Sequence, residues 1–377
     1  MMLSKFKWAI ISLIDYFKFL LFISKINNNE KLLIIVGHDG SSIGGASVVL
    51  NKLLLSLDTR NYKVVMLYKT GGSLLKKDRI NGYYPFVYQY FSQLYINSLR
   101  RKKVQAFLVN TIICSNVIKQ IQNKFACPIV WWLHEGEDLF KKMANKMPKD
   151  LSKNLTVLCV SSNTEKAFKK FYPNEKSCIF HYGIKDEFYN VKHLEKDKNK
   201  FVIGVVGMLC DRKNQLQIIS LLKKIPVKLI KNVKINVIAG TWDNAYKHTF
   251  LKRAQKFKQI NWIDGLDHKA LLEEYTRMDL LLCCSKNDPL PVVVTEAMMM
   301  ECPCLVSSGC GQYEYIENGV NGYKYDVNNT DEMVAQIVDA FNNKDIEKIK
   351  LNERKIYLKE FSMQQLVDRM SYYLLLR

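Results

Sequence analysis

A chain of 377 residues, 48% hydrophobic and 24% charged, has the composition of a globular protein long enough for two domains, which excludes a disordered chain. The 56 lysine and arginine residues outnumber the 36 aspartate and glutamate residues, giving a formal net charge of +20. This excess favours an anionic partner, and nucleic acid, an acidic membrane surface and a phosphorylated ligand all qualify.

Residues 1–28 are predicted to form an amphipathic helix at a membrane interface. Asp15 and Lys18 interrupt the apolar run before the ~20 residues that a membrane span requires, and no small-residue cleavage site follows. On a helix, one stripe collects the polar residues Ser4, Lys7, Asp15, Lys18 and Lys25. Aromatic and branched side chains cover the remainder, as in interfacial helices. The alternative is a helix packed on the protein's own surface.

Residues 29–190 are predicted to form a doubly wound α/β domain, because short apolar strands alternate with helices along this stretch. The expected strands are KLLIIVG, KVVMLY, AFLVN, IVWWLH and TVLCVSS. A glycine-rich turn, HDGSSIGGAS, follows the first strand and opens the helix VVLNKLLLSL. A strand, a glycine-rich turn and a helix in this order are typical of a Rossmann-like domain.

Residues 200–350 repeat this order after the charged segment NVKHLEKDKNK, and 351–377 are expected to be helices that cross back to the first domain. The strands expected in this second half are FVIGVVG, KINVIAG, INWIDG, DLLLCCS and PCLVSSG. We therefore predict two Rossmann-like doubly wound domains that face each other. Sites in such sheets gather at the carboxyl ends of the strands, so we expect the ligand cleft between the domains.

Ten cysteines lie mostly in apolar runs, and no CxxC pair occurs. We interpret them as reduced core residues of a cytosolic protein. A zinc site at Cys302 and Cys304 is the weaker alternative, since no second ligand pair follows at a suitable spacing.

A series of motifs over residues ~31–375 resembles, in the same order, those of family-4 retaining glycosyltransferases of the GT-B fold. They are HDGSSIGGAS, WWLHEGE, CVSSNTEKAF, HYGIKDEFY, GMLCDRKNQLQII, NDPLPVVVTEAM and GCGQYEYIENGVNGY. Each motif alone is a weak signal, whereas the ordered series is specific. The resemblance implies a nucleotide diphosphate sugar as donor, a retaining transfer and no bound metal or other cofactor.

The motif NDPLPVVVTEAM carries two carboxylates with seven residues between them, Asp288 and Glu296. The resemblance assigns Glu296, expected at the start of a helix, to the two ribose hydroxyls of the donor, and Asp288 to the hexose. Leu290 and Pro291 lie in the intervening donor-binding run, whose backbone N–H groups can face the diphosphate. The structural alternatives are a turn-forming aspartate before proline and a glutamate favoured by a helix dipole.

Arg212 and Lys213 stand where the family neutralises the donor's diphosphate, so we assign to them the charge that grows as the glycosidic bond breaks. The alternative is an ordinary surface pair. Gly44 and Gly45 would let the backbone of the first domain approach the diphosphate or the acceptor, because glycine has no side chain to clash. A tight turn opening a helix explains the same two glycines.

His134 follows the strand IVWWL at the position of the family's active-site histidine, where it would contact the transferred hexose. Glu135 would orient this histidine or help to bind the acceptor, and we do not assign it as a general base. The resemblance implies front-face attack, in which the departing phosphate oxygen takes the acceptor's proton. Glu301 and Cys310 depart from the family pattern, since both replace glycines.

The acceptor is expected on the first domain, where residues 83–103 mix aromatic side chains with basic ones that include Arg100 and Arg101. Together with the N-terminal helix, this segment suggests a saccharide acceptor linked to lipid at an anionic membrane surface. Nucleic acid is disfavoured, because no DNA- or RNA-binding module is recognisable.

The resulting hypothesis is a metal-independent retaining hexosyltransferase of cell-surface polysaccharide synthesis, lipopolysaccharide or capsule, peripheral on the cytoplasmic face of the inner membrane. The alternatives are a nucleotide-sugar epimerase of the same fold and a non-catalytic scaffold of envelope assembly.

Overall fold

The computed structural model describes residues 2–41, 45–240 and 243–376. Internal contacts divide the chain into two compact units, which we call the first unit (1–183 with 363–377) and the second unit (184–362). The chain's last helix thus belongs with its N-terminal half, and residues 1–28 are part of the same unit.

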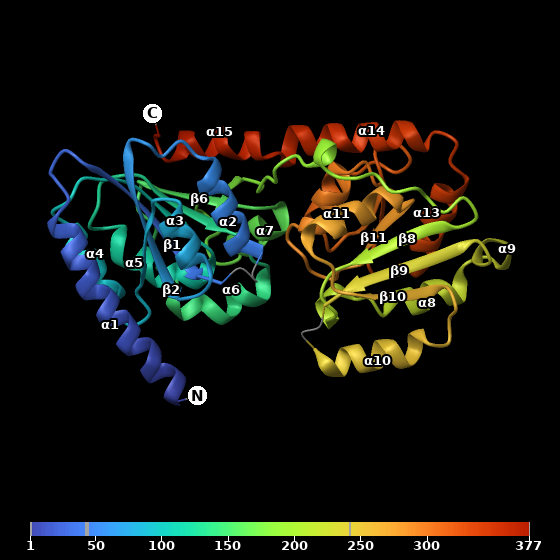
Figure 1. Ribbon diagram of the computed structural model, residues 1–377, viewed down its shortest axis with the longest axis horizontal. Helices are drawn as coiled ribbons and strands as arrows, with labels where there is room; N and C mark the ends of the chain where they lie inside the picture. The colour runs from blue at the N-terminus through green and yellow to red at the C-terminus, as the bar shows by residue number, and fades with distance from the viewer. Residues whose placement is uncertain (1, 42–44, 241–242, 377) are drawn as a thin grey trace. The chain divides into compact units, whose positions relative to one another are not determined.

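The first unit is built on a parallel sheet with the strand order β3-β2-β1-β4-β5-β6-β7 (Figure 1). Its central strands are nearly continuous apolar runs and are buried along almost their whole length, as expected for a parallel sheet with helices on both faces. The strands are β1 (Lys31–Asp39), β2 (Tyr62–Thr70), β3 (Tyr84–Val87), β4 (Val104–Asn110), β5 (Ile129–Leu133), β6 (Leu155–Cys159) and β7 (Cys178–Ile179).

All helices of the first unit except the first and the last connect successive strands, and the C-terminal helix packs against the first connecting helix. They are α1 (Met2–Ser24), α2 (Gly45–Ser56), α3 (Leu74–Ile80), α4 (Ser92–Leu99), α5 (Ser115–Ile121), α6 (Glu137–Met143), α7 (Ser162–Lys169) and α15 (Met363–Tyr373). The amide of Gln105 donates to the carbonyl of Leu375, and the ring of Tyr373 lies edge-on to Phe180. These contacts tie the C-terminus to the first unit.

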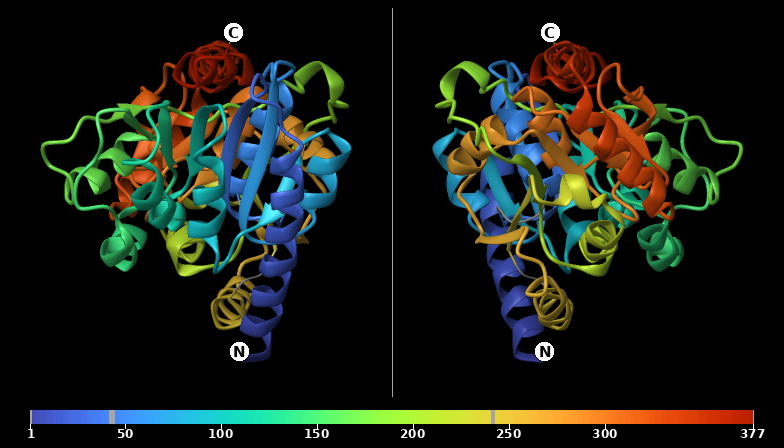
Figure 2. Two further views of the ribbon diagram at one scale, coloured as in Figure 1. Left: turned by 90° about the vertical axis from the view of Figure 1, so that its left-hand side faces the viewer. Right: turned by 90° about the vertical axis from the view of Figure 1, so that its right-hand side faces the viewer.

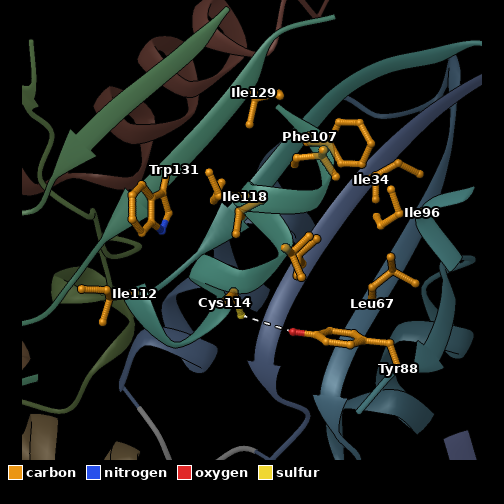
Figure 3. Packing of buried hydrophobic residues seen from close by; sticks show 14 of the residues in the cluster. Ile34, Leu67, Tyr88, Ile96, Phe107, Ile112, Cys114, Ile118, Ile129 and Trp131 are labelled. Atoms are coloured by element: carbon orange, nitrogen blue, oxygen red, sulfur yellow. Dashed lines mark hydrogen bonds between the residues drawn. The ribbon is translucent and has the colours of Figure 1, made fainter. Parts of the chain in front are cut away.

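The core on one face of this sheet is dominated by aromatic and branched side chains (Figure 3). Phe107, Trp131 and Ile129 project from neighbouring strands and are fully buried. The Tyr88 hydroxyl reaches the Cys114 sulfur at 3.6 Å, so its polar end is not left without a partner. This packing holds the carboxyl ends of β1, β4 and β5 in fixed positions.

Helix α1 lies along the outside of the first unit, beside α4 and β3 (Figures 1 and 2). Phe19 and Ile23 are buried against the unit, and so is Asp15, at 6% exposure. The Asp15 carboxylate accepts a hydrogen bond from the Val87 amide at 3.0 Å. Its assignment to a solvent-facing polar stripe is therefore wrong, because a carboxylate with such a partner can be buried.

The outer face of α1 is apolar. Its exposed side chains, 36–65% accessible, recur every three or four residues and are Ile10, Leu13, Ile14, Phe17, Leu20 and Leu21. Lys18, 61% exposed, flanks this outer stripe, whereas the side chains of Ser4 and Lys7 lie outside the part that the structure describes. Among the described residues, no helix is both long and apolar enough to cross a membrane.

The second unit repeats the architecture with the strand order β10-β9-β8-β11-β12-β13, again with parallel neighbours. Its strands are β8 (Phe201–Val206), β9 (Val233–Ala239), β10 (Ile260–Asp264), β11 (Leu280–Cys283), β12 (Cys304–Ser307) and β13 (Tyr323–Tyr325). Its helices are α8 (Gln217–Lys224), α9 (Val227–Ile230), α10 (Asn244–Ala254), α11 (His268–Arg277), α12 (Val292–Met299), α13 (Thr330–Asn342) and α14 (Ile346–Ile356).

The two sheets confirm the predicted α/β class with two doubly wound, Rossmann-like units. In each sheet the strand order reverses at one point, between β1 and β4 in the first unit and between β8 and β11 in the second. Ligands of such sheets bind outside the carboxyl ends of the strands at this reversal. We therefore expect a ligand site among the residues that follow these four strands.

Candidate functional site

The reversal point of the second unit holds a buried ion pair. Lys213 ends the turn after β8, and its ammonium group donates to a carboxylate oxygen of Asp288, which follows β11. These side chains are only 14% and 12% exposed. Arg212 lies 3.2 Å from the same oxygen and is 47% exposed. Two cations thus meet one carboxylate, and the group keeps one net positive charge.

Electrostatics keeps both members of this pair ionised. Burial alone raises the pKa of Asp288, but the charges of Lys213 and Arg212 outweigh it and the net pKa is lowered. Burial likewise lowers the pKa of Lys213, and the facing Asp288 carboxylate turns the net change upward. A fixed positive charge at a sheet's ligand end suits an anionic group such as a phosphate.

The backbone around Asp288 is held by the glycine-rich tail. The Asp288 amide donates to the Gly309 carbonyl at 2.8 Å, and the Gly311 amide donates to the Asp288 carbonyl at 3.2 Å. A β-carbon on Gly309 would lie 2.3 Å from the Ser285 carbonyl oxygen, so only glycine fits this crossing.

Helix α12 begins at Val292, four residues before Glu296, so the expectation that Glu296 starts a helix is wrong. Pro291 caps the helix, as its fixed φ and missing N–H group allow. The first-turn N–H groups therefore belong to Val292 and its neighbours, and Glu296 lies one turn further along the helix. Leu290 is 5% exposed, and the Pro291 carbonyl accepts from Gln312 at 3.0 Å.

Glu296 is buried in the second turn of α12 and is held at both oxygens by α11. His268 Nε2 lies 3.0 Å from Oε1, and the Tyr275 hydroxyl donates to Oε2 at 3.1 Å. The His268 side chain is 52% exposed, so the pair reaches solvent from one side. Sequence reasoning missed both partners, although their spacing of seven residues places them on one face of α11.

The reversal point of the first unit carries a second polar cluster. The Asn110 side chain, at the end of β4, lies 2.8 Å from His134 Nε2, just past the end of β5. Glu135 accepts from the backbone amides of His134, at 2.9 Å, and Ile112, at 3.2 Å. The structure therefore brings the predicted His134 and Glu135 together with Asn110, which sequence reasoning missed.

Burial dominates the ionisation of this cluster. It lowers the pKa of His134 to about 3, with a smaller contribution from His38, so the imidazole is neutral at physiological pH. Burial raises the pKa of Glu135 to about 7, although the two backbone amides oppose it. The cluster therefore offers a neutral imidazole and a carboxyl group that titrates near neutrality.

Thr111 adds backbone strain at the same place. Its φ of 75° and ψ of 156° are unusual for a β-branched residue. The conformation is held by its amide, which donates to the Trp132 carbonyl at 2.8 Å, and by its carbonyl, which accepts from the Trp131 indole at 3.1 Å. Its hydroxyl lies 3.5 Å from His38 Nδ1. Strain of this kind clusters at functional sites.

The remaining predicted site residues are Gly44, Gly45, Arg100 and Arg101. Gly45 begins α2 next to Ala46, whose carbonyl accepts from Asn110, and a β-carbon added at Gly45 would meet none of the described atoms within 4 Å beyond its own neighbours and helix. Gly44 lies outside the described residues. Arg100 and Arg101 are exposed at the end of α4 and line a concavity of about 730 Å³.

The two departures from the family pattern have structural counterparts. Glu301 has φ 55°, the left-handed conformation that glycine adopts most easily after a helix. Cys310 lies 3.5 Å from the Cys283 sulfur. None of the ten cysteines, all within the described residues, is disulfide-bonded, and in that part of the chain no cluster of three metal-ligating side chains occurs.

Comparison with known proteins relates the second unit to sugar-transferring enzymes. Residues 186–357 match the family model described as Glycosyl transferases group 1. The curated protein Sucrose synthase 6 of Arabidopsis thaliana is 25% identical over a region covering 47% of this chain and 20% of that protein. The chain thus spans about a fifth of the length of that relative.

Solved structures show that the chain has the GT-B fold over about nine tenths of its length. HepE of Anabaena, in complex with UDP, is 15% identical with a TM-score of 0.74 over 91% of this chain and 99% of its own. WaaB, a lipopolysaccharide outer core galactosyltransferase, is 14% identical with a TM-score of 0.70, over 90% and 98% of the two chains. WaaG, a glycosyltransferase involved in lipopolysaccharide biosynthesis, is 13% identical with a TM-score of 0.68, over 91% and 99%.

Proposed function

We propose that the protein is a glycosyltransferase that moves a hexose from a uridine diphosphate sugar to a saccharide acceptor. The observation that carries this proposal is the group at the reversal point of the second unit. There Lys213 and Arg212 share Asp288 just before the start of α12, and Glu296 lies in the second turn of that helix. The same segment matches the glycosyltransferase family model.

Each part of a nucleotide sugar has a fitting partner in this group. The diphosphate suits Lys213 and Arg212 together with the N-terminal N–H groups of α12. Glu296 suits the two ribose hydroxyls, because a carboxylate can accept two hydrogen bonds while His268 and Tyr275 hold it in place. Asp288 is assigned to the hydroxyls of the transferred hexose. HepE has been crystallised with UDP-glucose, which supports a uridine donor.

The transfer is proposed to retain the anomeric configuration and to need no metal. The bond between the anomeric carbon and the phosphate oxygen breaks, and the acceptor oxygen bonds to the same face of that carbon. The departing phosphate oxygen takes the acceptor's proton. Arg212 and Lys213 stabilise the charge that develops on the diphosphate, which is the contribution expected of fixed cations in a polar site.

The first unit is proposed to contribute the sugar and acceptor contacts. His134 would contact the transferred hexose, and Glu135 would bind an acceptor hydroxyl or orient His134. Gly44 and Gly45 are assigned to close approach of the backbone to the ligand. The strained Thr111 beside His134 supports a functional role for this cluster.

We further propose that the acceptor is linked to lipid and that the enzyme works, peripherally, on the cytoplasmic face of the inner membrane. The support is the exposed apolar stripe of α1, which Lys18 flanks, together with the exposed Arg100 and Arg101 just after α4. Tyr16 of α1 lies 3.2 Å from Ser98, beside these arginines. An apolar stripe with basic flanks fits an anionic bilayer surface.

Membrane binding is tested by sedimentation with vesicles of phosphatidylglycerol and phosphatidylethanolamine. Leu21→Ser, at a leucine 65% exposed on α1, should lower the bound fraction several-fold, whereas Leu351→Ser, at a leucine 54% exposed on the second unit, should not. Binding should also weaken with salt. Equal vesicle binding by the two variants and the wild type would refute the proposal that α1 binds the membrane.

Transfer is tested by incubating the protein with UDP-glucose, UDP-galactose and UDP-N-acetylglucosamine and a saccharide acceptor panel. We expect release of UDP and formation of a new glycoside. The coupling constant of its anomeric proton should match that of the donor, as retention requires. Addition of EDTA should leave the rate unchanged. An isomerised sugar nucleotide without transfer would indicate an epimerase, and neither product with any donor would indicate a non-catalytic protein.

A further inference from the structure

Asn110 is completely buried, and both ends of its side-chain amide are engaged. Its Nδ2 donates to the Ala46 carbonyl in α2 at 3.1 Å, and its Oδ1 lies 2.8 Å from His134 Nε2. A carbonyl oxygen can only accept, so the end of the amide that faces Ala46 must be the donor. The oxygen therefore faces His134, and this orientation follows from the network alone.

The same reasoning assigns the proton of the imidazole. Asn110 Oδ1 can only accept, so His134 Nε2 must carry a hydrogen and donate it. The imidazole is neutral, because burial lowers its pKa to about 3, and a neutral ring carries a single N–H group. His134 Nδ1 therefore keeps its lone pair. The ring is also packed at 4.5 Å, centroid to centroid, from Trp132, which restricts its rotation.

We propose that Asn110 is a positioning residue that holds His134 as the Nε2–H tautomer, so that Nδ1 accepts a hydrogen bond from a hydroxyl of the transferred sugar. The inference rests on the proposed function, in which His134 contacts the hexose. It also specifies the ligand group: a hydroxyl can donate to this nitrogen, whereas the carboxylate of a uronic acid would meet a lone pair.

The tautomer is tested directly by nitrogen NMR of the full-length protein labelled with ¹⁵N-histidine. His134→Gln identifies the resonances of His134 among those of the six histidines. The expected spectrum has a protonated Nε2 and an unprotonated Nδ1, unchanged down to about pH 5 because the ring does not titrate there. A protonated Nδ1, or an imidazolium at neutral pH, would overturn the proposal.

Variants at Asn110 separate a positioning role from a structural one. Asn110→Asp places a carboxylate against Nε2, which should raise the His134 pKa and add a proton to Nδ1. Asn110→Ala should leave a mixture of the two tautomers. Asn154→Ala is the control, because this side-chain amide donates to two backbone carbonyls of the first unit, at 2.9 and 2.7 Å, and no hydrogen bond joins it to His134. Loss of the tautomer in the control, or its persistence in both Asn110 variants, would contradict the assignment.

Ligand titration separates this inference from the proposed function. UDP-glucose, but not UDP, should shift the Nδ1 resonance, and Asn110→Asp should lower the affinity for UDP-glucose about tenfold while leaving that for UDP unchanged. Binding of UDP-glucose without a shift of Nδ1 would refute the sugar contact alone. Failure to bind either nucleotide would refute the proposed donor, while the tautomer would still be decided by the spectrum of the free protein.

Discussion

Breaking the buried pair between Lys213 and Asp288 should destabilise the second unit in a strongly non-additive way. Both side chains are at most 14% exposed, so removing either partner leaves a buried charge without its main counter-ion. Such losses cost about 3–5 kcal/mol when nothing compensates. Arg212, 3.2 Å from Asp288 and half-exposed, offsets part of the loss for Lys213→Met, for which we expect about 2–3 kcal/mol. Asp288→Asn, which leaves two cations unpaired, should cost about 3 kcal/mol.

The double variant should cost less than the sum of the single ones, because each single loss contains the penalty of the stranded partner. We expect a coupling free energy of about 2 kcal/mol. Hydrogen exchange of the β8 and β11 amides, monitored during urea titration, reports the free energy of unfolding of the second unit separately from that of the first. The control is the exposed pair Lys224 and Asp331, whose cycle should give at most about 0.5 kcal/mol. Additive effects within about 0.5 kcal/mol at the buried pair would refute the reasoning.

The same pair gives a pH dependence with a definite sign. The pKa of Asp288 is lower in the folded protein than in the unfolded chain. Its contribution is therefore complete above the unfolded pKa and is lost as pH falls through the folded one. The difference in stability between the wild type and Asp288→Asn should narrow below about pH 4. A constant difference down to about pH 2 would contradict the assigned pKa direction.

Three further changes test other parts of the structure. The pKa of Glu135 is raised to about 7 in the folded protein, so the free energy of unfolding falls as pH rises from about 4.5 to 7. In urea titrations, Glu135→Gln should remove this pH dependence and be more stable than the wild type by on the order of 3 kcal/mol at about pH 8. An equal pH dependence in the two proteins would contradict the burial argument. Glu301→Gly should be about 1 kcal/mol more stable than Glu301→Ala, because both variants lose the 3.6 Å ion pair to Arg354 but only glycine adopts the positive φ without strain. Equal urea midpoints for the two variants would show that this backbone conformation is not strained. His268→Ala should weaken UDP binding about fivefold in calorimetry, because the Glu296 carboxylate loses a hydrogen bond that holds it in place. Unchanged affinity would show that His268 does not contribute to nucleotide binding.

Much of the fold could be predicted because parallel strands buried on both faces leave a strong sequence signal. The run KLLIIVG, for example, is predicted as a strand and forms most of β1. The start of α12 was misplaced because Val292 and its neighbours are β-branched, and their low helix propensity is overridden by packing. Asp15 was placed on the wrong face because its partner, the Val87 amide, is 72 positions away in the chain.

The candidate site could be predicted only where a motif marked it. Lys213 and Asp288 were expected in separate roles, on the diphosphate and on the hexose, and the structure adds that they also bind each other. Their contact joins turns 75 residues apart, which no local pattern records. Asn110 sits at the end of a largely apolar strand, and its role follows only from the donor and acceptor geometry around it.

The most direct test of the proposed donor site is calorimetric titration of UDP and UDP-glucose into the wild type, Glu296→Gln and Asp288→Asn. Glu296→Gln should weaken both ligands by roughly tenfold to a hundredfold, because a charged acceptor of the ribose hydroxyls is lost. Asp288→Asn should keep the affinity for UDP, or tighten it by removing an anion beside Lys213, while slowing transfer from UDP-glucose. Normal UDP binding by Glu296→Gln together with a wild-type transfer rate for Asp288→Asn would contradict the proposed donor site.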